Sequence, residues 1–147
     1  MKIRITKEFD FEAAHALDGY KGKCKDIHGH SYHLKMTFIG EPKEQTSLSD
    51  CGMVVDFGDI KNIVKTKILP LFDHRLVLRK DTRFKELESI NERIRLVNYQ
   101  PTCENMLIEI VDIVQKNEPK GTKLVKGFLR ETANSYAQWN IEDNKNL

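Results

Sequence analysis

The chain has 147 residues, 39% hydrophobic and 31% charged, which predicts one soluble globular domain over residues 1–147 with a substantial core. Its formal net charge of +2, without a basic block interleaved with aromatic residues, argues against a nucleic-acid partner, and no apolar run approaches the roughly 18 residues of a membrane span. Three cysteines without framework spacing, and the lack of a signal-peptide core, favour reduced thiols and a cytoplasmic location.

Residues 3–15 alternate between apolar and polar side chains, which predicts one long β-strand. Lys7 interrupts the apolar row, as a bend in the strand would. The residues of this row are Ile3, Ile5, Phe9, Phe11, Ala13 and His15. A titratable imidazole therefore closes an otherwise apolar face.

The next predicted strand opens with two histidines, His28 and His30, separated by Gly29. Side chains two apart on a strand share a face, with Cα atoms roughly 6.6 Å apart, so both imidazoles can reach one ion. His33 has the opposite parity and is expected to face away. Hydrogen-bonded core histidines are the ordinary alternative, and with Cys24 just upstream both interpretations stay open. The same face continues with Tyr32, Leu34, Met36 and Phe38.

Residues 16–27 are expected to connect the two strands as the loop of an antiparallel hairpin. In that arrangement His15 meets His28 and His30 at the loop end. Three imidazoles with an open fourth position are typical of catalytic zinc, because structural zinc sites normally carry four ligands, mostly cysteines. The sequence therefore predicts a catalytic zinc centre.

Two amphipathic helices are predicted after the hairpin and a polar connector over residues 40–51. The first helix is expected to stop at Pro70, and the second to start at Thr102, a good N-cap. Their apolar stripes are Ile60, Ile63, Val64 and Ile68, and Leu107, Ile110, Val111 and Val114. Asp73 and His74 form an adjacent titratable pair between the helices.

The highly charged residues 79–98 predict a solvated helix and turn, with an extended run over residues 94–99. Two strands, residues 123–132 and 136–141, close the chain. Glu131 shares parity with Val125 and Leu129, which places a carboxylate on the buried side, where carboxylates are rare unless paired. The order is β-β-α-α-β-β. It predicts an α+β fold with an antiparallel sheet and helices on one face.

Six short motifs follow one another along the chain: Phe11-Glu12-Ala13-Ala14-His15, Cys24-x3-His28-Gly29-His30-Ser31-Tyr32, Gly52-Met53-Val54, Asp73-His74, Pro101-Thr102-Cys103-Glu104-Asn105 and Arg130-Glu131-Thr132. In this order they make the chain, over nearly its whole length, similar to the 6-pyruvoyltetrahydropterin synthase family, which includes bacterial 6-carboxytetrahydropterin synthases. The resemblance implies the tunnelling fold (T-fold), in which sheets join into a barrel in homo-oligomers, trimers that usually pair to hexamers.

The resemblance also implies three groups of site residues. The zinc ligands are His15, His28 and His30. The catalytic residues are Cys24, as general base or acid, with Asp73 and His74 as its activating partners. The substrate-binding residues are Glu131, which anchors the pterin ring, with Thr102 and Glu104 beside it. Without the resemblance, Asp73–His74 would be an ordinary loop pair and Glu131 an ion-paired carboxylate.

The implied reaction is that of a zinc-dependent lyase acting on 7,8-dihydroneopterin triphosphate. Two products stay open: 6-carboxy-5,6,7,8-tetrahydropterin, with acetaldehyde and triphosphate released on the route to queuosine precursors, or 6-pyruvoyltetrahydropterin of the tetrahydrobiopterin pathway. The compact chain favours the first. A non-catalytic zinc- or pterin-binding module and a water-activating hydrolase are the other classes, but neither needs Cys24, Asp73 and His74 together. Residues 79–100 are longer than in short bacterial members, a departure on the substrate side.

Overall fold

The computed structural model describes residues 1–44 and 49–145 of the chain. Residues 45–48, part of the predicted polar connector, lie outside the described residues. Among the helices of the described ranges, none is long and apolar enough to cross a membrane.

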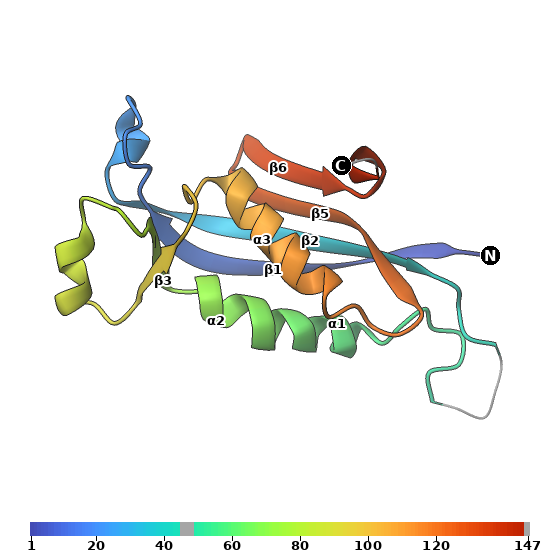
Figure 1. Cartoon of the computed structure of the whole chain (residues 1–147). Coiled ribbons are helices and arrows are strands. Elements are labelled where there is room, and N and C mark those ends of the chain that lie inside the picture. Colours follow the sequence, from blue (N-terminus) through green and yellow to red (C-terminus); the bar gives the residue numbers. More distant parts are fainter. Residues whose placement is uncertain (45–48, 146–147) are drawn as a thin grey trace.

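One six-stranded sheet forms the body of the protein (Figure 1). The strands are β1 (Ile3–His15), β2 (His28–Gly40), β3 (Arg75–Arg79), β4 (Ile94–Val97), β5 (Thr122–Thr132) and β6 (Ser135–Asn140). Their order in the sheet is β4-β3-β1-β2-β5-β6. The predicted hairpin is confirmed as β1 and β2, and the two predicted final strands are the antiparallel pair β5 and β6.

The prediction of an entirely antiparallel, four-stranded sheet was wrong in one respect, because two short parallel strands extend it. β3 pairs parallel with the last residues of β1, and β4 pairs parallel with β3. Residues 76–78 of β3 are all buried and apolar, so this strand shows no alternation. Periodicity cannot distinguish such a short run from part of a helix. The extended run predicted over residues 94–99 is confirmed as β4.

The hairpin of β1 and β2 pairs without a slip over its whole length. Ile3 lies opposite Gly40 at one end, and His15 lies opposite His28 at the other. Since side chains alternate between faces, an uninterrupted register keeps all odd positions of β1 and even positions of β2 on one side. That side is buried, and its β2 side chains from Tyr32 to Phe38 are almost fully inaccessible.

The first helical region is longer than the sequence predicted. It runs through α1 (Phe57–Ile63), a π-helical stretch η2 (Val64–Ile68) and α2 (Leu69–Phe72), so the expected stop at Pro70 was wrong. Pro70 lies in the first turn of α2, where a missing N–H costs least. The wider π turn, in which the Leu69 N–H donates to the Val64 carbonyl, precedes it.

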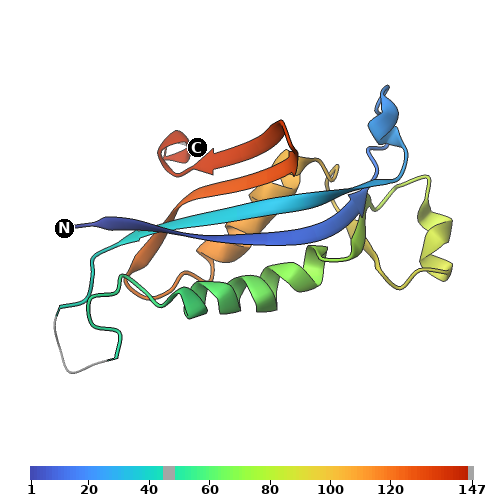
Figure 2. The ribbon, with the colours of Figure 1, turned by 180° about the vertical axis from the view of Figure 1, so that it is seen from behind.

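The helices cover one face of the sheet, as predicted (Figures 1 and 2). α3 (Cys103–Gln115) crosses β5, and the packing there is close, because a Cβ on Gly127 would lie 2.8 Å from Cγ2 of Val111. The residues buried between helices and sheet include Met36, Phe38, Ile60, Ile68, Phe72, Met106, Ile110 and Leu129.

Residues 79–100 do not form the predicted solvated helix. They contain a short 3-10 turn, η3 (Lys85–Ser89), before β4. The apolar residues Phe84, Leu87 and Ile94 of this segment pack against a second, smaller cluster around Ala16, whereas Ile90 is 80% exposed. These four residues therefore do not form one helical face, and three of them anchor the segment to the end of β1.

Candidate active site with a metal centre

Three histidines converge at the loop end of the hairpin, as the register of β1 and β2 requires. His15 and His28 are direct cross-strand partners, and His30 lies two residues further on the same face. One nitrogen from each imidazole lies within 4.8 Å of the other two. His15 is 2% exposed, while the other two are half-buried. The arrangement offers three nitrogen ligands to one ion.

Main-chain carbonyls orient two of the three rings. Nδ1 of His15 lies 2.6 Å from the carbonyl oxygen of Pro101, and Nδ1 of His28 lies 2.7 Å from that of Asp26. A carbonyl only accepts hydrogen bonds, so both Nδ1 atoms carry a proton, and in the neutral form of each ring the lone pair is on Nε2. Metal-binding histidines are held by such partners.

The ring orientations leave lone pairs facing each other. Nε2 of His15 lies 3.0 Å from Nε2 of His28, and Nε2 of His30 is a buried nitrogen with no hydrogen-bond partner among the described residues. Two lone pairs at this distance repel unless a cation lies between them. Tetrahedral zinc with bonds of about 2.05 Å places its ligand nitrogens roughly 3.3 Å apart, so the donor set fits zinc.

Burial keeps these imidazoles in the form that binds metals. Desolvation lowers the pKa of His15, although the Pro101 carbonyl and the nearby Glu131 carboxylate oppose this effect. Desolvation likewise lowers the pKa of His30. A lowered pKa means that both rings are neutral at pH 7, with a lone pair available.

Glu131 brings a carboxylate to the same cluster from β5. Its Oε1 accepts a hydrogen bond of 2.9 Å from the Tyr32 hydroxyl and lies 3.6 Å from Nε2 of His15 and 3.9 Å from Nε2 of His30. Burial and this carboxylate raise the pKa of Tyr32, so its hydroxyl stays protonated. No role was predicted for Tyr32, although its place on the face of His28 and His30 was a signal for one.

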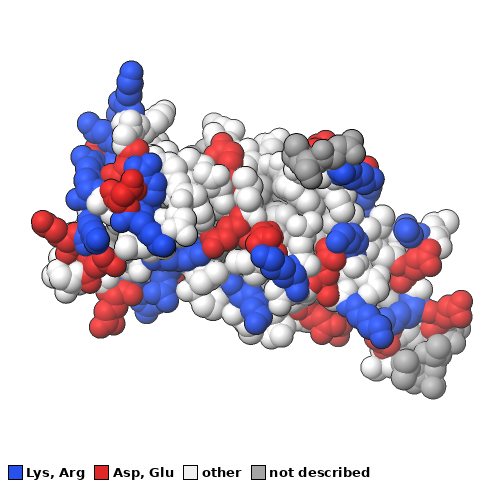
Figure 3. All heavy atoms as spheres, viewed as in Figure 1, with Lys and Arg blue, Asp and Glu red and all other residues white. Residues whose placement is uncertain are grey.

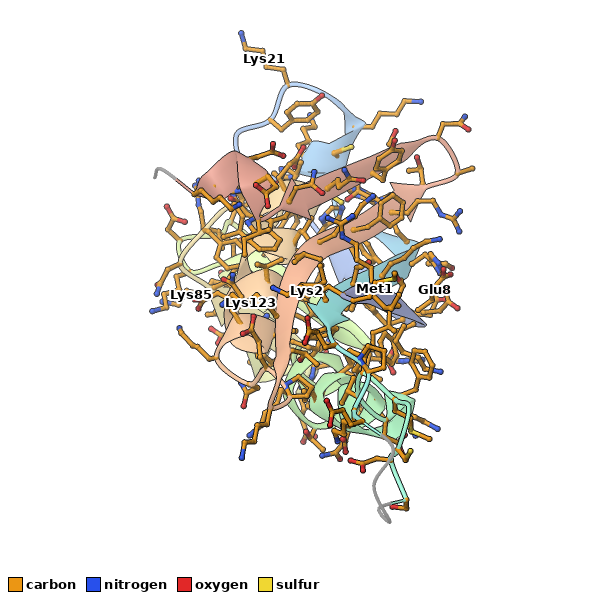
Figure 4. The ribbon with its side chains drawn as sticks, turned by 90° about the vertical axis from the view of Figure 1, so that its right-hand side faces the viewer. Met1, Lys2, Glu8, Lys21, Lys85 and Lys123 are labelled. Atoms are coloured by element: carbon orange, nitrogen blue, oxygen red, sulfur yellow. The ribbon has the colours of Figure 1, made fainter. Side chains whose placement is uncertain are left out.

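Cys24 lies in the loop that joins the two strands, within the 3-10 turn η1 (Lys23–Lys25). Its side chain is half-buried, and its carbonyl accepts a 2.9 Å hydrogen bond from the Leu17 N–H. Lysine and arginine side chains gather at this end of the molecule (Figure 3), and Lys21 projects from the tip of the loop (Figure 4). The loop begins directly after His15 and ends directly before His28, so it borders the group of three histidines.

The Asp73–His74 pair follows α2 and is fixed to the backbone of Glu12. Oδ1 of Asp73 accepts hydrogen bonds from Nδ1 of His74, at 2.9 Å, and from the Glu12 N–H, at 3.1 Å. The His74 N–H donates to the Glu12 carbonyl over 2.6 Å, and His74 adopts a left-handed φ of 56°. This strained backbone is held by the surrounding contacts and orients an imidazole that is largely exposed.

This pair does not meet Cys24 within one chain. His74 lines a hollow of about 480 Å³ together with Glu12, Ser31 and Arg93. Ser31 donates to the Glu12 carboxylate across the hairpin, and both positions have the parity opposite to that of the three histidines. Among the described residues, no hydrogen bond or ion pair links Cys24 to Asp73 or His74.

Thr102 and Glu104 lie at the start of α3. The Thr102 hydroxyl accepts a 3.3 Å hydrogen bond from the Asn105 N–H, which confirms the predicted N-cap. Glu104 is exposed in the first turn. The neighbouring Pro101 carbonyl is the group that orients His15, a main-chain contact that sequence reasoning missed.

Comparisons with known proteins agree on one family. Residues 4–142 match the family model described as 6-pyruvoyl tetrahydropterin synthase. A 6-carboxy-5,6,7,8-tetrahydropterin synthase of Haemophilus influenzae is 30% identical over 93% of this chain and 98% of its own length. One of Rickettsia typhi is 37% identical over 74% of this chain and 77% of its own.

Solved structures share the fold. The 6-pyruvoyl tetrahydropterin synthase of Caenorhabditis elegans superimposes with a TM-score of 0.69 at 25% identity, over 95% of this chain and 96% of its own. A protein of Wolinella succinogenes described as uncharacterized gives a TM-score of 0.76 at 19% identity, over 95% of this chain and 98% of its own. These likenesses confirm the predicted T-fold.

Proposed function

Because the chain belongs to the 6-pyruvoyl tetrahydropterin synthase family, we propose that it is a zinc-dependent lyase acting on 7,8-dihydroneopterin triphosphate. The proposed products, formed with the uptake of one water molecule, are 6-carboxy-5,6,7,8-tetrahydropterin, acetaldehyde and triphosphate, on a cytoplasmic route to queuosine precursors. The names of the two bacterial relatives support this product. The observation that carries the proposal is the set of three converging Nε2 lone pairs.

The residues divide the chemistry between them. Zinc bound by the three histidines would act as a Lewis acid on the substrate's side-chain diol and make its protons easier to remove. Cys24 would take or return a proton beside the pterin ring, which requires a thiolate and therefore a nearby cation. The Asp73–His74 pair would supply that cation, with Asp73 accepting a hydrogen bond from Nδ1 and so orienting the ring. Hydrogen moves within the substrate, so no nicotinamide or flavin is needed.

Glu131 would hold the pterin ring by accepting from its 2-amino group and N3–H. The hydrogen bond from Tyr32 to Oε1 restricts the carboxylate to one orientation beside the metal cluster. Thr102 and Glu104, at the start of α3, would lie beside the ring. Arg, Lys or Gln at position 131 would present donors where acceptors are needed, which is the reason for a carboxylate here.

The proposed activity requires an assembly of several chains. Within one chain, Asp73 and His74 bond to each other and to the Glu12 backbone, and among the described residues neither contacts Cys24 by a hydrogen bond or ion pair. A homo-oligomer, a trimer or a hexamer, would bring His74 of one copy to Cys24 of another. The site is incomplete without that second copy.

The metal assignment is tested by metal analysis of the freshly purified protein. We expect about one zinc per chain, as a three-histidine site implies. The double variant His28→Ala, His30→Ala should lose the zinc, whereas His33→Ala, a histidine on the opposite face, should retain it. Full zinc content in the double variant would rule out this site.

The reaction is tested by mass analysis of the products formed from 7,8-dihydroneopterin triphosphate. 6-Carboxytetrahydropterin with acetaldehyde supports the proposal, and 6-pyruvoyltetrahydropterin supports the second candidate, which the name of the C. elegans neighbour favours. Cys24→Ala should retain zinc and lose turnover by several orders of magnitude. Unchanged pterin in the wild-type reaction, with zinc bound, would indicate a binding module.

A further inference from the structure

The segment between β3 and β4 lies beside the loop that carries Cys24. Figures 1 and 2 both show the loop of residues 16–27 and the turn η3 at the same end of the molecule. The segment belongs to residues 79–100, which the resemblance to the family marks as longer than in short bacterial members. One side chain from it, Arg83, reaches across to the loop.

Arg83 contacts three residues in the loop of residues 16–27. Its Nη2 donates to the main-chain carbonyl of Lys25 over 2.9 Å and to Oδ1 of Asp26 over 2.7 Å. Its Nε lies 3.8 Å from Oδ1 of Asp18, a carboxylate that is only 9% exposed. The Arg83 N–H also points to that oxygen, at 3.5 Å. One residue is therefore attached to both ends of the loop.

The residues that Arg83 holds are the ones next to Cys24 and His28. Lys25 directly follows Cys24, whose own carbonyl is tied to the Leu17 N–H. The carbonyl of Asp26 accepts the Nδ1 proton of His28 and so fixes the orientation of that ring. A displacement of residues 25–26 would therefore move the thiol and turn the imidazole together.

Arg83 and its neighbours are themselves packed against the rest of the protein. Its guanidinium lies over the Phe84 ring, 4.5 Å from the centroid, and Phe84 packs with Leu87 against the cluster around Ala16. The preceding residue, Thr82, is 5% exposed. At the far end of the segment, Nε2 of Gln100 donates to the Asp18 carbonyl over 2.8 Å. The segment is thus docked on the protein at both ends.

We propose that Arg83 is a positioning residue, through which the segment of residues 79–100 holds Cys24 and His28 in their working positions. The role assigned to Cys24 rests on the proposed function, but the hold on the loop does not. An arginine suits the task because its planar guanidinium can donate from Nη2 to the Lys25 carbonyl and the Asp26 carboxylate while its Nε faces the Asp18 carboxylate. A lysine in its place would keep the charge, but its single ammonium group has no second nitrogen to face Asp18 while it binds Lys25 and Asp26.

The hold on the loop is tested by amide hydrogen exchange in the full-length protein. Arg83→Ala should speed exchange at the Leu17, Lys25 and Asp26 amides by roughly three- to tenfold, the range expected when a half-exposed charged hydrogen bond is lost. Amides of β5 and α3 should be unchanged. The control is Arg79→Ala, because Arg79 pairs with Asp81 inside the same segment. Unchanged exchange in the loop would overturn the proposal.

The link to catalysis is tested by a double-mutant cycle between Arg83→Ala and Asp26→Ala, with zinc content measured for each. Both single variants should lower kcat by about the same factor with little change in KM, and the double variant should be no worse than either. Arg83→Lys should recover part of the loss. Additive losses in kcat, or a normal kcat with a loosened loop, would overturn the positioning role. If Arg83→Ala speeds amide exchange in the loop but the wild-type protein shows no turnover, the proposed function alone is refuted.

Discussion

At the scale of single residues, the state of the metal centre is set by main-chain carbonyls. The carbonyls of Pro101 and Asp26 each accept a hydrogen bond from Nδ1–H of one histidine and so turn its Nε2 inward. The two carbonyls come from distant parts of the chain, since Pro101 precedes α3 and Asp26 lies in the hairpin loop. Ring orientation therefore depends on the fold as a whole, although the ligands come from one hairpin.

The three cysteines differ in surroundings, and their reactivity should follow. Burial raises the pKa of Cys103 to about 12, and its thiol donates to the Leu129 carbonyl, so it should stay protonated at pH 7.5. We expect iodoacetamide to modify Cys24 at least roughly tenfold faster than Cys103 in the folded protein, because only thiolate reacts. Peptide mass mapping over time measures both rates.

In urea-unfolded protein the two rates should converge, which serves as the control. His74→Ala should slow the modification of Cys24 if the pair from another copy activates the thiol. An unchanged rate in that variant would mean that Cys24 does not depend on His74.

At the scale of elements, the hairpin and α3 meet at the site. α3 starts where Thr102 accepts the Asn105 N–H, and this cap places the preceding Pro101 carbonyl against His15. The start of the helix is thus coupled to the metal cluster. On the other face of the hairpin, charged side chains tie β1 to β2.

The cap of α3 should contribute measurably to stability. Thr102→Ala should lower the free energy of unfolding by about 1 kcal/mol, the usual cost of losing a capping oxygen. Thr102→Asp keeps an acceptor for the Asn105 N–H and should recover most of it. Urea unfolding of the metal-loaded protein measures both, and equal midpoints for Thr102→Ala and wild type would show that the cap is dispensable.

Comparing turnover in the same two variants separates the cap from substrate binding. If Thr102→Asp is stable but inactive, the hydroxyl itself contacts the substrate, as the resemblance implies. If it is stable and active, Thr102 serves only as the cap.

The charged cluster on the outer face of the hairpin should make stability depend on acid pH. Hydrogen bonds from Lys35 and His33 lower the pKa of Glu8 below its usual 4.5. His33 lies between two carboxylates, with Nε2 at 2.9 Å from Glu8 and Nδ1 at 2.6 Å from Asp10. A lowered carboxyl pKa means that the unfolded chain binds more protons, so stability is present above about pH 4.5 and is lost as pH falls through the folded value.

Thermal melts from pH 7 to pH 3 of wild type and Glu8→Gln test this. Wild type should lose its advantage over the variant as the pH falls below about 4.5, and 0.5 M salt should reduce the difference because the cluster is exposed. A difference in melting temperature between wild type and Glu8→Gln that stays the same from pH 7 to pH 3 would contradict it.

At the scale of the whole molecule, the sheet is incomplete as a monomer. Residues 3–11 of β1 have β2 on one side, while β3 pairs only with Ala13, Ala14 and His15 on the other. β6 forms the opposite edge, and Figure 2 shows strands β1, β2, β5 and β6 without a helix over them. Long unpaired edges are rarely left open in native proteins, and closure into a barrel removes them.

The assembly is tested by mixing chains that are each inactive. Cys24→Ala and His74→Ala, refolded or co-expressed together, should recover part of the wild-type activity, because some sites then combine an intact Cys24 with an intact His74. Each variant alone should stay inactive. A fully active monomer in sedimentation would exclude shared sites.

The sequence predicted those features of the fold and of the site that follow from regular patterns among neighbouring residues. The hairpin, the capped α3 and the meeting of His15 with His28 followed from alternation and parity, because both strands are long and regular. β3 was missed because its three buried residues do not alternate, and the first helix was predicted too short because Pro70 was taken as a stop. The contacts of Pro101 and Arg83 were out of reach, since they join residues far apart in the chain through atoms that leave no pattern.

The unbroken register of β1 and β2 also restricts how the length of this gene segment can vary. One extra codon between positions 3 and 15 would shift the following side chains by one place and turn His15 toward the opposite face of the sheet. Two extra codons would restore the face but move the imidazole along it by about 6.6 Å. Insertions and deletions in this region should therefore accumulate in residues 19–23, between the loop residues Asp18 and Lys25 that Arg83 contacts, and libraries that vary strand length should yield metal-binding clones only at the original length.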